Sequence, residues 1–394
     1  MDIDKKAIEI TIFTNKEIAS ALLEDLESIG MEYSNSIAGR RILLQERKGL
    51  FKMLGTGKSL MYDPITIITF LVSSEIEQTI ISFIIKKGRL NIPGRGTVFS
   101  KEVTLIKAHE LCQENKIPNI EIENRKLLSD LAGICCIAHS GEGDILGRVG
   151  LETGSGVPAI TLGIGTGFRD KIGLWRVAIP AEKEIVNLVT TAHNVEKVME
   201  MMIDIGALDQ PGKGFIYHYP IKMGSVNMKA YVGLSRQAAS IEQMVTVIDE
   251  IKGDTRWRRR EFSKYPTAGK KIKYLKDLVN FTLICDEGRA TDLIKAAMDA
   301  GAGGATISKL KYRSTKKSES SKISPARESS EMIISEKQIE RVVKALEESG
   351  ALDENTHGQM FYSPIPKAYT YMKKASVSRR ANPEERDVLI ATSQ

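Results

Sequence analysis

A twelve-residue segment that occurs three times constrains this chain more than any other feature. The copies begin at Gly88, Gly206 and Gly350 and align without gaps. Each has leucine two residues after its first glycine, then asparagine or aspartate, and another glycine eight residues after the first. Such self-similarity is typical of repeated structural units. The sequence therefore predicts three copies of one unit, and 394 residues allow about 100 for each copy.

The residues before each copy repeat as well. Each copy follows a β-rich run and an amphipathic helix, and another strand, helix and strand lie upstream. Gly30, Gly154 and Gly301 are placed to end the first helix of each unit in the left-handed conformation. With the strand after each copy, the order is βαββαβ, so the expected fold class is α+β with three ferredoxin-like units. The predicted segments before the copies are 8–13, 16–30, 31–37, 64–73 and 74–87; 133–138, 142–152, 158–164, 184–191 and 192–205; and 278–285, 289–300, 304–312, 330–335 and 336–349.

The repeats divide the chain into units and joining segments. Between their second and third strands the units differ, with insertions at 38–63, 165–181 and 313–329. We expect these insertions to be long loops, which in compact domains are usually functional or disordered. The expected units are 1–107, 131–234 and 277–372, with a linker at 108–130, a helical and basic linker at 235–276 and a C-terminal tail at 373–394.

Three stretches carry a resemblance to a known family: Gly-Ile-Gly-Thr-Gly at 163–167, Pro-Ala-Glu-Lys-Glu-Ile-Val at 180–186 and Ala-Gly-Gly-Ala-Thr-Ile at 302–307. With the predicted strand order, the chain resembles the P-II nitrogen-regulatory signalling proteins, and most of all their divergent PII-like branch. The resemblance implies units that such proteins assemble as homotrimers, with adenine nucleotides in clefts between neighbours and signalling through a long T-loop. Three units in one polypeptide then imply a monomeric, single-chain pseudo-trimer.

The resemblance also implies a phosphate site in each glycine-rich loop, the family's B-loop. Glycines let backbone N–H groups approach an anion closely, and a nearby cation offsets its charge. The family's lysine after the last loop glycine is replaced here by Thr97, Phe215 and Gln359, although Arg95 and Lys213 can supply a cation from within the loop. The matching positions are Gly94, Arg95 and Gly96; Gly212, Lys213 and Gly214; and Thr356, His357 and Gly358.

The start of the T-loop contributes to ligand binding in classical family members. By resemblance, the corresponding residues are Gly39, Arg40 and Arg41 in the first unit and Gly165, Thr166 and Gly167 in the second. The chain has no counterpart of the family's glutamine that contacts 2-oxoglutarate or of its uridylylated tyrosine. The resemblance therefore favours nucleotide binding over classical nitrogen sensing.

Other motifs favour structural interpretations. The Gly-Lys-Ser sequence ending at Ser59 lacks the first glycine of a P-loop, and Asp63-Pro64 follows it instead of a helix. Cys135 and Cys136 lie in a predicted central strand and are expected in the core. The five histidines show no metal-ligand spacing, and no catalytic set can be assembled. We therefore expect no metal site and no enzymatic activity.

Charge and composition set broad limits on location and partners. The net charge of +6 is weak evidence for nucleic acid, which is an unlikely partner on this basis. The stretch 256–276 holds nine Lys or Arg residues, which fit either a solvated or docking linker or a segment that contacts phosphate. The apolar stretch 65–85 is interrupted by polar residues, no signal peptide is visible, and four cysteines fit a reducing compartment. The expected location is cytoplasmic, without membrane insertion.

Two functions remain open at this stage. The first is a regulator that binds an adenine nucleotide, ATP or ADP, between units and controls a partner enzyme or transporter through its T-loops, with nitrogen metabolism as the implied setting. The second is a degenerate PII-like scaffold or interaction protein that has lost nucleotide binding. Loss of the family lysine is compatible with the second function.

Overall fold

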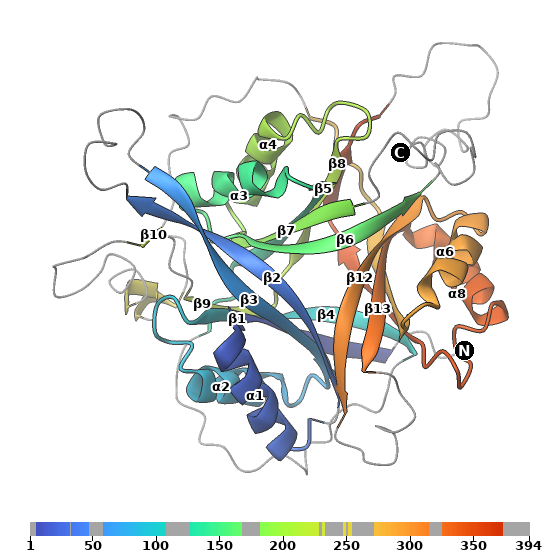
Figure 1. Cartoon of the computed structure of the whole chain (residues 1–394), viewed down its shortest axis with the longest axis horizontal. Coiled ribbons are helices and arrows are strands. Elements are labelled where there is room, and N and C mark those ends of the chain that lie inside the picture. Colours follow the sequence, from blue (N-terminus) through green and yellow to red (C-terminus); the bar gives the residue numbers. More distant parts are fainter. Residues whose placement is uncertain are drawn as a thin grey trace.

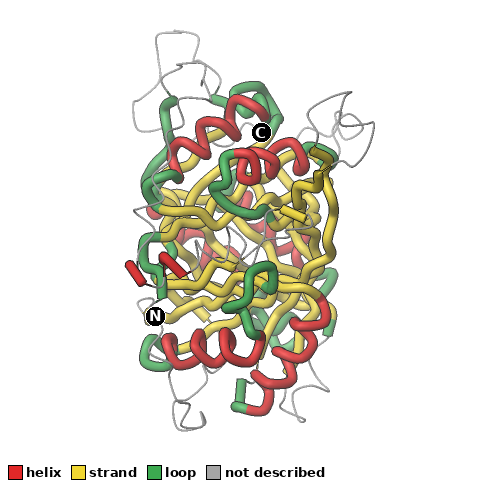
Figure 2. The backbone as a smooth tube through the Cα atoms, turned by 90° about the vertical axis from the view of Figure 1, so that its left-hand side faces the viewer, coloured by secondary structure: helices red, strands yellow, loops and turns green. Residues whose placement is uncertain are grey.

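The computed structural model describes residues 5–31, 33–46, 58–107, 127–167, 182–227, 231–232, 247–249, 251–253, 272–314 and 325–372. Within these residues the chain is a mixed α/β structure with one fifteen-stranded sheet. Every pairing of named strands in the sheet is antiparallel except that of β10 with β2. The helices lie on the outside, and the strands fill the interior (Figures 1 and 2).

Four strands and two helices make up the first part of the chain, residues 5–107. The strand order is β2-β3-β1-β4. Ile8, Ile10 and Ile12 of β1 turn the same way, as expected of alternate residues in a strand, and pack with the apolar sides of α1 and α2. The elements are β1 (Lys5–Asn15), α1 (Lys16–Ser28), β2 (Tyr33–Glu46), β3 (Lys58–Val72), α2 (Glu77–Gly88) and β4 (Gly96–Lys107).

The second part of the chain, residues 127–232, repeats this arrangement with the order β6-β7-β5-β8. Val198, Met199 and Met202 of α4 are fully buried in its core, as the spacing predicted. Two short strands follow the repeated elements. The elements are β5 (Leu131–His139), α3 (Gly143–Glu152), β6 (Ala159–Gly167), β7 (Glu182–Thr191), α4 (Val195–Ile205), β8 (Gly214–Pro220), β9 (Met223–Asn227) and β10 (Tyr231–Val232).

The third part, residues 272–372, has the order β12-β13-β11-β14. Its second helical segment begins as a 3-10 turn, which a capping box between Ser335 and Gln338 holds in place. Val342, Val343 and Leu346 then face the core. The elements are β11 (Leu278–Asp286), α6 (Ala290–Asp299), β12 (Gly304–Ser314), β13 (Ala326–Ser335), η6 (Glu336–Gln338), α8 (Ile339–Glu348), β14 (Gln359–Ile365) and β15 (Lys367–Thr370).

The predicted strands and helices are present, but the expected loop at 38–63 is wrong in its bounds. β2 continues to Glu46 and β3 already begins at Lys58, with Gln45 paired to Ser59. The physical reason is burial of Ile42, Leu43 and Leu44, which pack into the core of the second part. The insertion at 313–329 is shortened at both ends in the same way, by β12 and β13.

Three residues predicted to end helices do so. Gly30, Gly154 and Gly301 have φ angles of 81°, 60° and 111°. Several predictions lie outside the described residues: residues 108–126 of the first linker, 168–181 of the second insertion, 235–246, 250 and 254–271 of the helical and basic linker, the tail from 373, and most of the Gly-Thr-Gly-Lys-Ser segment. None of the helices in the described ranges is long and apolar enough to cross a membrane.

The three parts are joined by two cycles of strand pairing. Through the fourth strands of the three parts, β9 pairs with β4, β4 pairs with β14, and β15 pairs with β8. Around the centre of Figure 1, β2 pairs with β6, β6 with β12, and β12 with β2. Each part therefore contributes backbone hydrogen bonds to both of the others.

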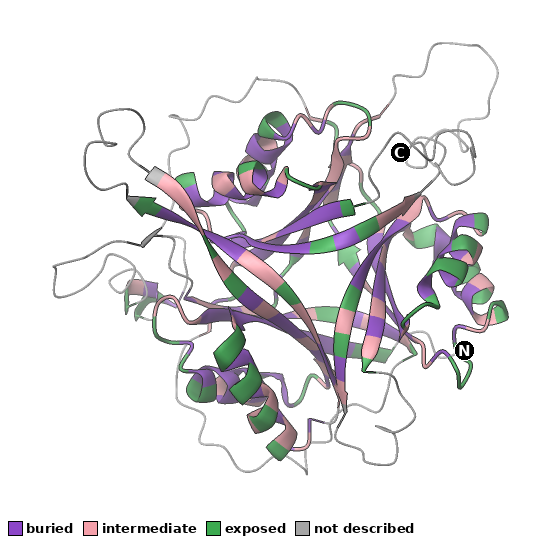
Figure 3. Ribbon diagram, viewed as in Figure 1, coloured by how far each residue is buried: buried purple, intermediate pink, exposed green. Residues whose placement is uncertain are grey.

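Hydrophobic cores follow the same division. Each pair of helices covers its own core, and the strands between them are largely buried (Figure 3). A further cluster, which includes Phe13, Cys135, Tyr217 and Ile365, spans the inner faces of the sheet and contains residues from all three parts. The helices are therefore peripheral, and the strands form the junction.

Candidate functional site

The glycine-rich loops connect the second helix of each part to its fourth strand, β4, β8 or β14. A Cβ atom at Gly96, Gly214 or Gly358 would overlap the backbone carbonyl oxygen of Phe13, Ile137 or Ala351, respectively. Only glycine allows the loop to enter the strand at this distance from the neighbouring backbone. Steric crowding therefore explains why each copy has glycine at its last conserved position, without any bound ligand.

The third loop is built differently from the other two, and the gapless alignment is wrong by one residue at its start. Arg89, Ala207 and Gly350 adopt the left-handed conformation, and the next residue in each case is fully buried. In the third copy that buried residue is Ala351, whereas Leu352 is exposed. Gly358 therefore comes eight residues after the left-handed residue, one more than in the other two loops.

In the first loop the chain's own atoms already contact the predicted phosphate-binding groups. The Gly94 N–H donates to the carbonyl of Asn227 at 2.5 Å, at the end of β9. Arg41 donates from Nη1 to the Gly94 carbonyl at 2.9 Å and from Nε to Asp63 at 2.6 Å. The positive φ of 91° at Gly94 fits the predicted tight turn.

Arg95 is directed away from this junction. Its Nε donates to the carbonyl of Gly88 at 2.9 Å. The side chain lines a shallow pocket of about 300 Å³ beside Asn15, Glu17 and Lys87, at the ends of α1 and α2. The cation that contacts the first loop across the sheet is therefore Arg41, which lies in the predicted T-loop start, and not Arg95.

In the second loop a histidine and a lysine hold the turn. His139 Nε2 lies 2.6 Å from the Gly212 carbonyl, so this nitrogen carries the proton and donates it. Lys183 Nζ lies 3.2 Å from His139 Nδ1 and donates to it. Lys213, the predicted phosphate cation, pairs with Glu142 at 2.8 Å, and its side chain remains 38% exposed. Sequence reasoning missed His139 and Lys183, since only the sheet brings them to the loop.

The second loop also meets the third part of the chain. Thr370, at the end of β15, donates from Oγ1 to the Gly214 carbonyl at 2.9 Å. The first and second glycine-rich loops therefore each contact the end of a strand that belongs to another part.

In the third loop a fully buried arginine, Arg327, holds the loop by hydrogen bonds. Arg327 donates from Nη2 to the carbonyls of Ile284 and His357, and its Nε lies 3.7 Å from Asp286 Oδ1. Asp286 Oδ2 is 2.7 Å from His357 Nδ1. Burial lowers the pKa of Arg327, and Asp286 opposes that effect. The ring of Tyr312 lies 5.1 Å from the guanidinium carbon.

The strand register corrects the match between the two T-loop starts. Gly39 pairs with Ile65, and Gly163 pairs with Lys183, at equivalent positions of the first and second parts. Gly163, and not Gly165, therefore corresponds to Gly39. Gly165, Thr166 and Gly167 instead pair with β12, and Thr166 Oγ1 donates to the Ala305 carbonyl at 3.3 Å.

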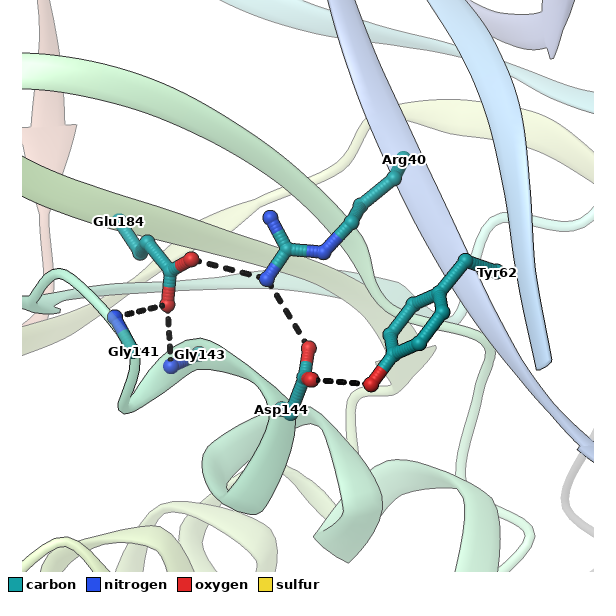
Figure 4. Close-up of polar contacts among 6 residues, drawn as sticks. All are labelled: Arg40, Tyr62, Gly141, Gly143, Asp144 and Glu184. Atoms are coloured by element: carbon teal, nitrogen blue, oxygen red, sulfur yellow. Dashed lines mark hydrogen bonds and ion pairs between the residues drawn. The ribbon is translucent and has the colours of Figure 1, made fainter. Parts of the chain in front are cut away.

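Arg40 joins the first and second parts through a cluster of polar side chains (Figure 4). Its Nη2 donates to Asp144 at 2.9 Å and to Glu184 at 2.8 Å. Glu184 also accepts the N–H groups of Gly141 at 3.0 Å and Gly143 at 2.6 Å, at the start of α3. A carboxylate is favourable there because the helix N-terminus carries partial positive charge and unpaired N–H groups.

The electrostatics of this cluster stabilise the charged form of Arg40. Burial alone acts to lower the pKa of Arg40, but hydrogen bonds and attraction from Glu184 and Asp144 outweigh it and raise the pKa. Tyr62 donates its hydroxyl to Asp144 at 2.6 Å, which raises the pKa of the tyrosine. In this structure Arg40 is therefore paired with carboxylates of the second part.

The described residues contain no group of three or more His, Cys, Asp or Glu side chains that could hold a metal ion. Cys135 and Cys136 are 2% and 0% exposed, which confirms their predicted place in the core. Burial raises the pKa of Cys135 to about 12, so its thiol stays protonated.

Comparisons with known proteins add no family. A scan of protein-family models finds none that matches the chain, and no curated protein matches it. The resemblance drawn from the sequence therefore remains a prediction.

Proposed function

We propose that the chain is a PII-like regulator: three ferredoxin-like units in one polypeptide, packed as a pseudo-trimer, with an adenine nucleotide bound at a cleft between units. Ligand binding would order a T-loop and change affinity for a partner protein. Such ordering of a segment is a common form of regulation. The proposal involves no catalytic step.

One observation carries this proposal. The first and second glycine-rich loops each meet a strand end from another part of the chain, through Gly94 with Asn227 and Gly214 with Thr370. A ligand held at either loop would therefore lie next to residues of a second unit. The threefold repetition of strand order and the cyclic pairings are further support.

A degenerate scaffold is the second candidate, and a specific observation favours it. The ionisable or basic residue of each loop is already engaged by the chain itself: Arg95 with the Gly88 carbonyl, Lys213 with Glu142, and His357 with Asp286. A nucleotide phosphate would have to displace these contacts. Displacement is easiest at the second loop, because Lys213 and Glu142 form a partly exposed ion pair.

Calorimetric titration of the full chain with ATP, ADP and AMP tests both candidates. Binding that weakens at least about tenfold in Lys213→Ala supports the regulator, since a charge-assisted phosphate contact is lost. Lys344→Ala, an exposed lysine on α8, is the matched control and should not change affinity. Absence of binding at millimolar nucleotide contradicts the regulator, and specific capture of a partner by such a protein would support the scaffold.

A further inference from the structure

Seven polar or ionisable side chains meet where the inner faces of the sheet come together. They come from all three parts of the chain, so no single part contains the cluster. Most of these residues lie in segments that the sequence predicts as strands, with no sign of a functional site. The residues are Glu9 on β1, Lys101 on β4, Cys135 on β5, Tyr217 and Tyr219 on β8, Asn280 on β11 and Glu331 on β13.

The cluster holds two carboxyl groups and one ammonium group. Lys101 Nζ lies 2.9 Å from Glu9 Oε2, and the two side chains are only 14% and 11% exposed. The ammonium also lies 5.3 Å from the centre of the Tyr219 ring, a favourable cation–π distance. With Glu9 and Lys101 paired, an ionised Glu331 would be a second negative charge without a cation of its own.

Glu331 is held by neutral groups. The Tyr217 hydroxyl lies 3.2 Å and the Asn280 Nδ2 atom 3.4 Å from Glu331 Oε2. Asn280 Oδ1 is buried and has no hydrogen-bond partner among the described residues. An amide rotated by 180° would place this oxygen near Glu331 and the Tyr217 hydroxyl, and a protonated Glu331 could then donate to it.

Lys101, the Cys135 thiol and the two tyrosines keep their charge state near neutral pH. Burial acts to lower the pKa of Lys101, but Glu9 outweighs it and raises the pKa, so the ammonium stays charged. Burial raises the pKa of Cys135 to about 12 and those of Tyr217 and Tyr219 well above their usual range. Burial also raises the pKa of Glu331, and Glu9 reinforces this effect. Lys101 and the hydrogen bonds from Tyr217 and Asn280 oppose the rise but do not outweigh it.

We infer that Glu331 is a proton-binding site that makes the junction of the three parts sensitive to pH. The protonated carboxyl completes a neutral hydrogen-bond network with Asn280 and Tyr217. The ionised carboxyl leaves excess negative charge beside Glu9, at the contact between strands of different parts. This inference does not depend on nucleotide binding.

The sign of the effect follows from linkage. The pKa of Glu331 is raised above its ordinary value of 4.5, so the folded chain binds more protons than the unfolded chain above that pH. The stabilisation is present below about pH 4.5 and is lost as pH rises through the raised pKa. For one proton, the unfolding equilibrium constant rises by at most about tenfold per pH unit in that window.

The test compares unfolding midpoints of the full chain from about pH 5 to about pH 8. Glu331→Gln keeps the shape and removes the titration, so the difference in midpoint between variant and wild type should grow with pH. Glu354→Gln removes an exposed carboxyl of the same part and should run parallel to the wild type. A Glu331→Gln profile parallel to the wild type overturns the inference.

A second measurement covers the case in which Glu331→Gln does not fold. The infrared spectrum of the wild-type chain should contain a protonated-carboxyl band at a pH where ordinary carboxyl groups are already ionised, and this band should disappear as pH rises further. A wild-type spectrum without this band across the range also overturns the inference. Neither measurement involves nucleotide. A failure of this inference would therefore leave the proposed function standing, and the reverse is also true.

Discussion

The second and third glycine-rich loops are held by different residues at the same positions of the sheet. His139 pairs with Lys183 across β5 and β7, and Asp286 pairs with Arg327 across β11 and β13. In both parts a side chain of this pair donates to a loop carbonyl. Arg327 and Lys183 are both buried, but the second loop carries a further cation, Lys213, whose side chain is 38% exposed.

This difference separates a structural loop from a candidate binding loop. The third loop depends on the buried Arg327, whose removal would leave two loop and strand carbonyls without their donor and Asp286 with His357 alone. The second loop can rearrange around an anion by exchanging one partly exposed ion pair for another. We therefore expect the second loop to be the more responsive of the two to ligand, and the third to contribute more to stability.

The largest effect is expected from Arg327→Met. Removing this side chain breaks two hydrogen bonds to carbonyl groups and leaves Asp286 without its buried cation, at a cost of about 3–5 kcal/mol in the free energy of unfolding. Denaturant titration measures the loss. Lys183→Met, at the equivalent position of the second part, should cost much less. Equal losses in the two variants would remove the distinction between the loops.

Glycine substitutions should give the next largest effect. Gly358→Ala places a Cβ atom against the Ala351 carbonyl, and overpacking of this kind costs about 1–3 kcal/mol. Gly212→Ala meets no atom within 4 Å, so it should cost only the strain of its φ angle of 71°, about 1 kcal/mol. Thermal unfolding of the two variants compares them, and the reverse order would contradict the close approach at Gly358.

Arg40→Met should have a moderate effect on stability. It removes partly exposed hydrogen bonds to Asp144 and Glu184, worth about 0.5–1.5 kcal/mol, and Glu184 keeps two backbone N–H donors. In the third part, Glu328 caps α6 through the N–H groups of Gly288 and Ala290, and no ion pair to it is found among the described residues. If Arg40→Met leaves the free energy of unfolding unchanged in denaturant titration, the backbone N–H donors alone hold Glu184 in place, as they do Glu328 in the third part.

Lys213→Ala should have the smallest effect on stability. Its pair with Glu142 is partly exposed, and such pairs contribute about 0–1 kcal/mol. Unfolding experiments should therefore give a midpoint close to that of the wild type. A loss as large as that of Arg327→Met would show that the second loop is structural as well.

Much of the local structure was predictable from the sequence. The helical spacing of Val198, Met199 and Met202 predicted which side of α4 is buried, since a helix places such residues on one side. The β-rich runs predicted the strands, and Cys135 and Cys136 were correctly placed in the core. These features depend on residues close together in the chain.

The loops and the junction were less predictable. The repeated glycines suggested phosphate binding, but Gly96, Gly214 and Gly358 have a steric reason that only the neighbouring backbone reveals. The one-residue shift in the third loop leaves Leu352 aligned in sequence with Leu90, although Ala351 takes the buried place. The expected loop after residue 38 became strand because Ile42 and Leu44 are buried by residues of the second part.

The order of strands and helices along the chain follows from local sequence signals, because periodicity and turn residues act over a few neighbouring positions. The cation that meets each loop, and the meeting of Glu9, Lys101 and Glu331, depend instead on contacts between distant segments. The physical reason is separation along the chain: a charge affects another when they are close in space, and strand pairing alone brings residues hundreds of positions apart to within a few ångströms.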